Sequence, residues 1–279
     1  MQLDKAKIKQ SFAAASATYD KVAALQRTVG KALLRFSPRL SPGMLLDLGC
    51  GTGFLTSELL ARQVGYASRT LNLGGCLENG TRCVPYMTVI ALDIALPMLQ
   101  LTRTKLADTP NVSYLCADAE QLPLAGLSVD AVYSNLALQW CVNLDVVFAD
   151  IKRTLKPGGS LVFSTFGPQT LQELKAAWAE VDDHSHVNEF YSEQQLSAFL
   201  LLGGFTRITF ETRLYTSRYD SVLALMQELK QIGAHNVISG RNKSITTQTM
   251  LQGMIKAYQQ QRTDKLIPAT FEVIMVTAS

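Results

Sequence analysis

The residues best suited to chemistry are an acid and a short run of glycines that follows it. Asp47 ends an apolar stretch, and Gly49, Gly51 and Gly53 follow it at every second position. Glycines allow a tight turn and a close approach of the backbone to a ligand. The helical pattern that begins after them offers free N–H groups to an anionic group. The run therefore predicts a loop that binds a small organic ligand.

The spacing of this run argues against a nicotinamide dinucleotide. Loops of that kind follow the pattern G-x-G-x-x-G, whereas this chain has G-x-G-x-G. Asp47 also puts a carboxylate where a pyrophosphate would lie. Both features disfavour a dehydrogenase and favour a ligand with a cationic end, such as the amine and sulfonium of S-adenosylmethionine.

Polar residues also end the next three apolar runs. Asp93 ends residues 88–93, Asp118 follows residues 112–117, and Asn135 ends residues 129–135. Ligands of parallel sheets bind outside the carboxyl ends of the strands. We therefore expect Asp93 to hold the ribose hydroxyls, Asp118 and Ala119 the adenine, and Asn135 the amino-acid end of the cofactor or the acceptor. Taken singly, each acid could equally be a turn or helix N-cap residue.

Short apolar runs that alternate with helical patterns position these residues. Such alternation is typical of βαβ units. It predicts an α/β fold with a doubly wound, mostly parallel seven-stranded sheet. The expected strands are residues 44–49, 88–93, 112–118, 129–135, 160–166, 205–215 and 269–278, and the expected helices include residues 54–63, 96–108 and 144–155.

The remaining segments suggest a division of the chain. Residues 4–20 and 22–36 read as helices and predict an N-terminal arm or lid over residues 1–40. Residues 41–279 form the expected main domain, with further helical elements at about 168–202 and 220–260. Residues 64–87 are longer than a usual connection and read as a surface insertion. Cys76 and Cys83 within it could be a disulfide, half a metal site or two free thiols.

Composition limits the class of protein. The 279 residues are 47% apolar and 18% charged, which suits one large domain or a domain with a subdomain. No apolar run reaches the roughly 18 residues of a membrane span, and the first residues lack the hydrophobic stretch of a secretory signal. Five scattered cysteines favour a reduced, cytoplasmic protein.

Charge is unevenly distributed along the chain. Residues 1–40 carry eight Lys and Arg against two acids, residues 41–200 carry nine against sixteen, and residues 201–279 carry nine against five. Basic flanks attract anionic partners, although they could equally serve solubility alone. Nucleic acid is disfavoured because no basic run is interleaved with aromatic residues.

Residues 41–165, including the turn LKPGG, resemble the class I S-adenosylmethionine-dependent methyltransferases. Four further stretches resemble one branch of them, the malonyl-acyl carrier protein O-methyltransferases of biotin synthesis. These stretches are SFAAASATYDKVAALQR, SNLALQWCVNL, LQELKAAWAEVDDHSHVNEF and LKQIGAHNVISGR, and they extend the resemblance from about residue 8 to residue 243. The insertion is the departure from the family pattern.

The resemblance implies the reaction and its partners. The cofactor is S-adenosylmethionine without a metal, and the acceptor is the free carboxylate of malonyl-acyl carrier protein or malonyl-CoA. That carboxylate is already ionised at pH 7, so no general base is required and the enzyme has only to align it. Methylation removes a charge that an apolar elongation pocket would reject. We expect a cytoplasmic monomer.

Substrate-positioning residues are expected to be hydrogen-bond donors. Tyr19, His186 and Arg213 are the candidates for holding the acceptor carboxylate, because a carboxylate outside water needs charge-assisted partners. Arg213 could equally be a surface charge and His186 a loop residue.

The apolar wall and the docking surface complete the expected site. Gln139, Trp140 and Phe190 are expected in the substrate pocket, although Trp140 could simply pack the following helix. The carrier protein is acidic, and its expected docking residues are Lys230, Arg241 and Lys243.

Two other functions remain open from the sequence. One is a C- or O-methyltransferase of a quinone precursor or another small molecule, for which His184 or His186 could be the base. The other is a catalytically inactive methyltransferase-like subunit, which the intact glycine run and Asp93 disfavour.

Overall fold

A computed structural model describes residues 4–38, 42–71, 77–78, 81–82, 87–234, 247–260 and 265–279, with side chains throughout except between residues 63 and 82. Cys76, Cys83, Arg241 and Lys243 lie outside the described residues. No helix in the described ranges is long and apolar enough to cross a membrane.

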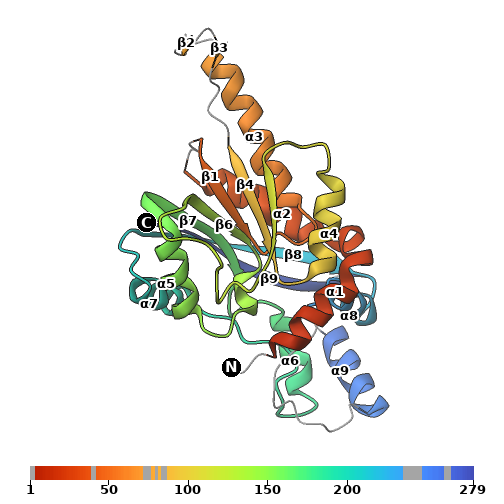
Figure 1. The fold of residues 1–279 in the computed structure, drawn as a ribbon. Helices are drawn as coiled ribbons and strands as arrows, with labels where there is room; N and C mark the ends of the chain where they lie inside the picture. The colour runs from red at the N-terminus through yellow and green to blue at the C-terminus, as the bar shows by residue number, and fades with distance from the viewer. Residues whose placement is uncertain are drawn as a thin grey trace.

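A seven-stranded sheet forms the centre of the molecule (Figure 1), as the sequence predicts. Its order is β5-β4-β1-β6-β7-β9-β8. The first five strands in this order are parallel to one another, and β9 is antiparallel to both β7 and β8. The strands are β1 Met44–Leu48, β4 Thr88–Asp93, β5 Val112–Cys116, β6 Val129–Asn135, β7 Leu155–Phe166, β8 Ile208–Tyr219 and β9 Ile267–Ala278.

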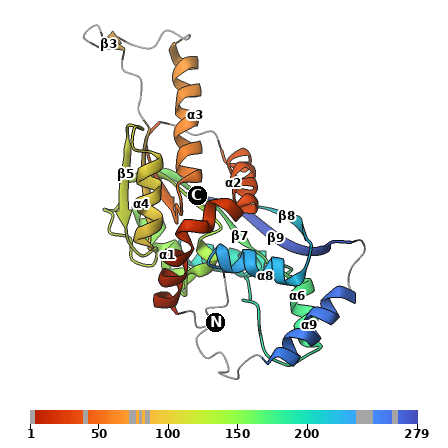
Figure 2. The same ribbon diagram turned by 90° about the vertical axis from the view of Figure 1, so that its right-hand side faces the viewer.

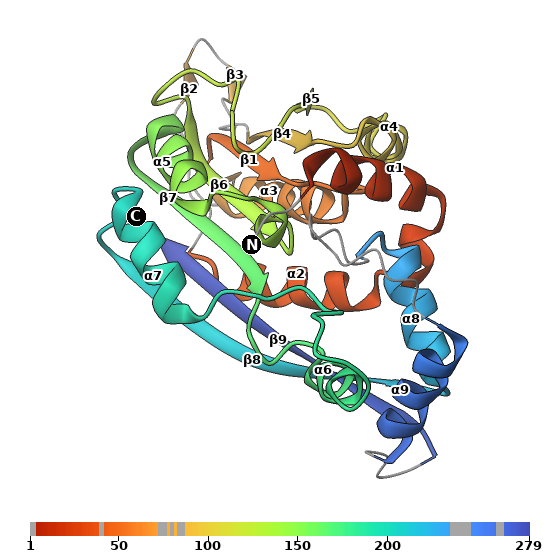
Figure 3. The same cartoon turned by 90° about the horizontal axis from the view of Figure 1, so that it is seen from below.

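Helices cover both faces of this sheet (Figure 3). Successive side chains of a strand point to opposite faces. Leu45 of β1 accordingly joins a core with helices α2, α3, α6, α8 and α9, whereas Leu46 and Leu48 join a second core with α5 and α7. The helices are α1 Lys5–Val22, α2 Ala24–Phe36, α3 Phe54–Leu71, α4 Leu96–Lys105, α5 Leu144–Thr154, α6 Gln172–Ala179, α7 Glu193–Leu202, α8 Val222–Gln231 and α9 Gln248–Gln260.

Two boundaries differ most from the sequence expectation. Helix α3 does not end near residue 63 but continues to Leu71, into the expected insertion, and projects beyond the sheet (Figure 2). A two-stranded ribbon of β2 (Leu77–Glu78) and β3 (Thr81–Arg82) follows it. Strand β7 begins at Leu155 rather than residue 160, because the LKPGG segment interrupts the pairing with β6 without ending the strand.

Helix α1 packs against α4 and α8 (Figure 3). The side chain of Asp4 caps its first turn by accepting the N–H of Lys7 at 3.2 Å. Ion pairs hold both ends of α1, from Lys5 to Asp118 in the loop after β5 and from Asp20 to Lys105 at the end of α4. Helix α1 thereby covers the carboxyl ends of the parallel strands.

Candidate active site

The glycine loop connects β1 to α3 in a conformation that only glycine adopts easily. Gly49 and Gly53 have φ angles of +76° and +85°, in the left-handed region that disfavours other residues. A Cβ on Gly49 would lie 2.3 Å from that of Ala137. The N–H groups of Gly49 and Cys50 both donate to the Leu92 carbonyl, at 2.8 and 2.9 Å, so the loop is fixed to the end of β4.

Asp93 holds the loop from the next strand. Its Oδ2 accepts the N–H of Gly51 at 2.9 Å, and its Oδ1 accepts the N–H of Ala95 at 2.8 Å. The side chain is buried, and burial raises the pKa of this carboxyl. Each oxygen still has acceptor capacity for a ligand hydroxyl.

Asp47 lies beneath the loop rather than on its open side. It is fully buried, and its Oδ2 accepts the hydroxyl of Thr56 at 2.5 Å. Its Oδ1 has no hydrogen-bond partner among the described residues. Burial, together with the charge of Asp93, raises the pKa of Asp47 to about 7.

A cleft runs along the open side of the loop. It consists of two adjoining cavities of about 100 and 400 Å³ that share Tyr19, Gly49, Gly51 and Asn135. We refer to it as the glycine-loop cleft. Of the predicted cofactor residues it is lined by Gly49, Gly51, Gly53, Asp93, Asp118, Ala119 and Asn135. Asp47 does not line it.

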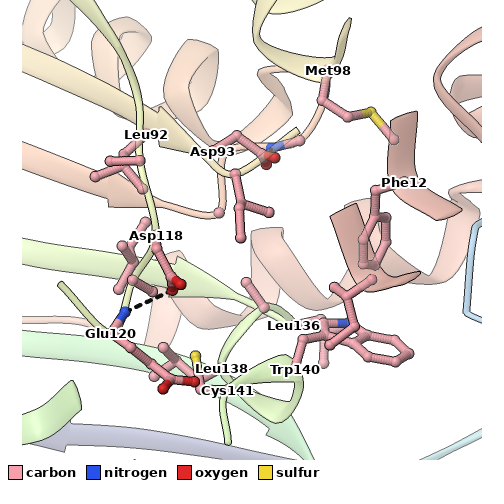
Figure 4. A pocket seen from close by; sticks show the side chains of 18 of the residues that line it. Phe12, Leu92, Asp93, Met98, Asp118, Glu120, Leu136, Leu138, Trp140 and Cys141 are labelled. Carbon is pink, nitrogen blue, oxygen red and sulfur yellow. Dashed lines mark hydrogen bonds between the residues drawn. The ribbon is translucent and has the colours of Figure 1, made fainter. Parts of the chain in front are cut away.

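Two acidic side chains from the loop after β5, Asp118 and Glu120, form one end of the glycine-loop cleft (Figure 4). The Oδ1 of Asp118 accepts the N–H of Glu120 at 2.9 Å. Lys5 of α1 bridges both acids, at 2.6 Å from Asp118 and 2.9 Å from Glu120. The start of α1 is thus fixed at the position where the sequence predicts adenine recognition.

Asn135 ends β6, and both polar atoms of its side chain are hydrogen-bonded within the protein. Its Nδ2 donates to the Gln26 carbonyl and its Oδ1 accepts the Ser164 hydroxyl, both at 2.9 Å. The next residue, Leu136, has a φ of +51°, which is unusual for a branched side chain. Gln139 is buried and donates to the Leu136 carbonyl at 2.7 Å. It therefore stabilises this turn and lines neither the glycine-loop cleft nor the cavity beyond it.

Trp140 separates the glycine-loop cleft from a second cavity of about 430 Å³, because it lines both. Aromatic side chains from several elements enclose this second space, which we call the aromatic cavity. They are Trp140, Phe166, Trp178, Phe190 and Phe271. Phe190 packs edge-on against Phe166 with ring centroids 5.5 Å apart.

His186 is the one histidine among the residues lining the aromatic cavity. Its Nε2 lies 2.9 and 3.0 Å from the two carboxylate oxygens of Asp182. Its ring is stacked on the indole of Trp178 with centroids 3.7 Å apart and planes 10° apart. The ring is therefore fixed in orientation.

The structure separates the three predicted positioning residues. Tyr19 lines the glycine-loop cleft, and burial raises its pKa with help from the charges of Asp93 and Asp20. His186 lines the aromatic cavity. Arg213 lies on the exposed edge strand β8 and pairs with Glu211.

Several residues at the site were missed by sequence reasoning. Lys5 and Phe12 reach the glycine-loop cleft from α1, and Gln26 and Asn188 line the aromatic cavity. The sequence carries no local signal for them, because each is placed by the packing of distant segments.

Comparisons with known proteins agree with this geometry. A family model described as a methyltransferase domain matches residues 71–163. The malonyl-[acyl-carrier protein] O-methyltransferase of Methylovorus sp. is 38% identical, covering 98% of this chain and 88% of its own length. The biotin biosynthesis bifunctional protein BioHC of Cellvibrio japonicus is 39% identical, covering 97% of this chain and 49% of that protein.

A solved structure shares the fold. Phosphoethanolamine N-methyltransferase 2 of Haemonchus contortus, in complex with S-adenosyl-L-methionine, superposes with a TM-score of 0.52 at 19% identity, over 95% of this chain and 56% of that one. The full-length sequence similarity is the stronger finding, and by it the chain belongs to the family of malonyl-[acyl-carrier protein] O-methyltransferases.

Proposed function

We propose that this protein transfers the methyl group of S-adenosylmethionine to the free carboxylate of a malonyl thioester carried on an acyl carrier protein, in the synthesis of biotin. Trp140 carries the proposal, because it lines both the glycine-loop cleft and the aromatic cavity. A cofactor in the one and an acceptor in the other would meet at this residue. The names of the family relatives supply the acceptor.

The glycine-loop cleft fits the cofactor by its chemistry. Asp93 offers carboxylate acceptors beside exposed glycine backbone, as a ribose requires. Asp118 and the backbone of Ala119 lie beyond apolar side chains of Leu92 and Leu138, which suits a planar purine with polar edges. When bound, S-adenosylmethionine supplies an electrophilic methyl group. Asp47, below the loop, acts only by stabilising this arrangement.

The acceptor needs alignment rather than deprotonation. A malonyl carboxylate is ionised at neutral pH, so the protein's task is to hold one oxygen in line with the methyl carbon. Tyr19 borders the reacting end of the glycine-loop cleft, while His186 and Lys230 are the basic side chains that line the aromatic cavity. We propose these three as its hydrogen-bond donors. Arg213, which is exposed and paired with Glu211, is the weaker candidate.

Methylation changes how the acceptor interacts with the aromatic cavity. A methyl ester carries no charge, so it loses the attraction of the basic donors. Substrate binding is therefore favoured by charge and product release by its removal.

We also propose that Lys230 receives the acidic carrier protein, with Arg241 and Lys243 as further docking residues. Lys230 lies at the end of α8 and lines the aromatic cavity. A charge at this place can guide the carrier protein and its arm together. The protein is proposed to act as a cytoplasmic monomer.

Docking can be tested by charge reversal. Lys230→Glu is expected to raise the KM for malonyl-acyl carrier protein about tenfold, since a charged interfacial pair is worth one to several kcal/mol. Lys230 is also a proposed hydrogen-bond donor to the acceptor carboxylate. The change in KM for malonyl-CoA, which has no carrier protein, measures that second effect. Arg103→Glu, an exposed charge on α4, is the matched control. Equal losses with both substrates would exclude the docking role.

The reaction itself is tested with labelled S-adenosylmethionine and purified protein. Malonyl-acyl carrier protein, malonyl-CoA, succinyl-CoA and a phenolic acceptor are offered side by side. We expect label in a base-labile malonyl methyl ester, and rescue of a biotin auxotroph that lacks this step. Label in the phenol alone would replace the proposal with the small-molecule alternative.

A further inference from the structure

Two side-chain amide oxygens, on residues that line the aromatic cavity, are without partners among the described residues. The Oδ1 of Asn188 and the Oε1 of Gln26 are buried, and neither has a hydrogen-bond partner among the described residues. Both residues line the aromatic cavity. Asn188 is only 7% exposed, so water from outside does not readily solvate it.

Such an arrangement is costly in a folded protein. More than 90% of buried polar groups have a partner, and an unsatisfied one costs about 1 to 3 kcal/mol. The structure describes only one other buried side-chain oxygen in this condition, on Asp47 below the glycine loop. Two of the three therefore belong to residues that line one cavity, where a ligand can supply the missing partners.

The one hydroxyl among the residues that line this cavity is already used, and so is the one carboxylate. The hydroxyl of Thr170 donates to the Glu272 carbonyl at 3.0 Å, and the acid Glu228 accepts the Tyr219 hydroxyl at 2.8 Å. Gln26 and Asn188 are thus the side-chain amides that remain available to a ligand. Gln26 also borders the glycine-loop cleft, so it lies where the two spaces meet.

The malonyl group cannot satisfy these oxygens. Its carboxylate and its thioester carbonyl are acceptors only, and an acceptor does not pair with an acceptor. The arm that carries the thioester is different, because a pantetheine arm has two secondary amides, each with an N–H donor and a carbonyl acceptor. An N–H of this arm can donate to either unpaired oxygen, which neither acceptor group of the malonyl unit can do.

We propose that Gln26 and Asn188 are specificity-determining residues that hold the amides of the pantetheine arm. This inference rests on the proposed function, since it assumes that a malonyl thioester enters the aromatic cavity. It adds that the enzyme recognises the pantetheine arm, through hydrogen bonds to its two amides, as well as the malonyl group. Malonyl thioesters on simple alkyl thiols would then be poor substrates.

The test compares malonyl-pantetheine with an analogue in which both amide N–H groups are ester oxygens. Wild-type enzyme should methylate the ester analogue with a kcat/KM about 10- to 100-fold lower, the size expected for leaving buried polar groups unpaired. The measured quantity is the ratio of kcat/KM for malonyl-pantetheine to kcat/KM for the ester analogue. Asn188→Leu and Gln26→Leu should each reduce this ratio, and the double variant should bring it close to one. Thr170→Val, whose hydroxyl is satisfied within the protein, should leave the ratio unchanged.

Folding of the variants provides a second measurement. Replacing an unpaired buried amide by an apolar group of similar size is nearly neutral or stabilising, so Asn188→Leu should melt no lower than wild type. A large fall in Tm would show that the amide is paired within the protein and would overturn the proposal. So would an unchanged ratio in the double variant. Methylation of malonyl-pantetheine by the wild type would still support the proposed function in either case.

Discussion

The indole of Trp140 meets the phenyl ring of Phe12 edge-on, with centroids 5.4 Å apart and ring planes at 81°. The two residues are far apart in the chain, one on α1 and the other in the turn after β6. Figure 4 shows them side by side at the wall of the glycine-loop cleft. The residue between the two cavities is therefore held in place by the N-terminal helix.

Trp140→Ala should reduce methyl transfer by opening this wall. We expect kcat/KM for malonyl-acyl carrier protein to fall at least tenfold at saturating cofactor, because small misplacements of reacting groups are expensive. Trp140→Phe keeps an aromatic partner for Phe12 and should retain most of the activity. A Trp140→Ala enzyme with normal cofactor affinity and full turnover would show that the indole only packs the turn.

Lys5 should control how long the cofactor stays bound. Its ion pairs with Asp118 and Glu120 hold the start of α1 over the glycine-loop cleft. Partly exposed pairs contribute about 0.2 to 1 kcal/mol, so Lys5→Met should raise the cofactor dissociation rate up to about fivefold. Stopped-flow fluorescence of Trp140 would measure this rate.

The matched control for Lys5 is on the same helix. Lys7→Met removes an exposed pair with Asp4 that does not border the glycine-loop cleft, and it should leave the dissociation rate unchanged. High salt should weaken the effect of Lys5 by screening. Identical rates in Lys5→Met and wild type would mean that α1 does not limit cofactor release.

The strand ends were predictable because their signals are local. Each buried strand is an apolar run, and parallel strands bring their carboxyl ends to one edge. Asp93, Asp118 and Asn135 therefore meet in the structure as the sequence predicts. The last strand, β9, was predicted from its own apolar run, and the structure pairs it antiparallel with β7.

Side-chain direction was not predictable in the same way. Asp47 and Gln139 carry polar groups near the site, but both side chains are hydrogen-bonded inside the protein. Asp47 accepts the Thr56 hydroxyl, and Gln139 donates to the Leu136 carbonyl. Arg213 follows the strand alternation but falls on an exposed edge. These outcomes depend on tertiary packing, which adjacent residues in the sequence do not encode.

Asp47 should make stability depend on pH. Its folded pKa of about 7 lies above its ordinary value of 3.8 because of burial. The folded state therefore holds this proton more tightly than the unfolded state does. Its contribution to the free energy of unfolding is greatest at low pH and declines between about pH 4 and pH 7.

Asp47→Asn removes this titration while keeping an oxygen for the Thr56 hydroxyl. Urea unfolding of both proteins between pH 4 and pH 8 would measure the difference. A difference of the order of 2 to 4 kcal/mol should develop as pH rises, since each pKa unit corresponds to about 1.4 kcal/mol. Parallel pH curves for the two proteins would contradict the raised pKa.

His186 provides the test of the reaction type. Asp182 and Trp178 fix its ring at the aromatic cavity, and either of two roles would use that fixed ring. A hydrogen-bond donor to an ionised acceptor needs only an N–H, whereas a general base must take a proton. His186→Gln keeps the first property and loses the second.

We expect His186→Gln to keep kcat for malonyl-acyl carrier protein within about threefold of wild type, because loss of a general base costs about 10²- to 10⁴-fold. His186→Ala should mainly raise KM, since it removes a contact to the bound acceptor. Both values come from initial rates at saturating S-adenosylmethionine. A hundredfold loss of kcat in His186→Gln would instead indicate an acceptor that must be deprotonated, and it would favour a phenol or carbon acid over a carboxylate.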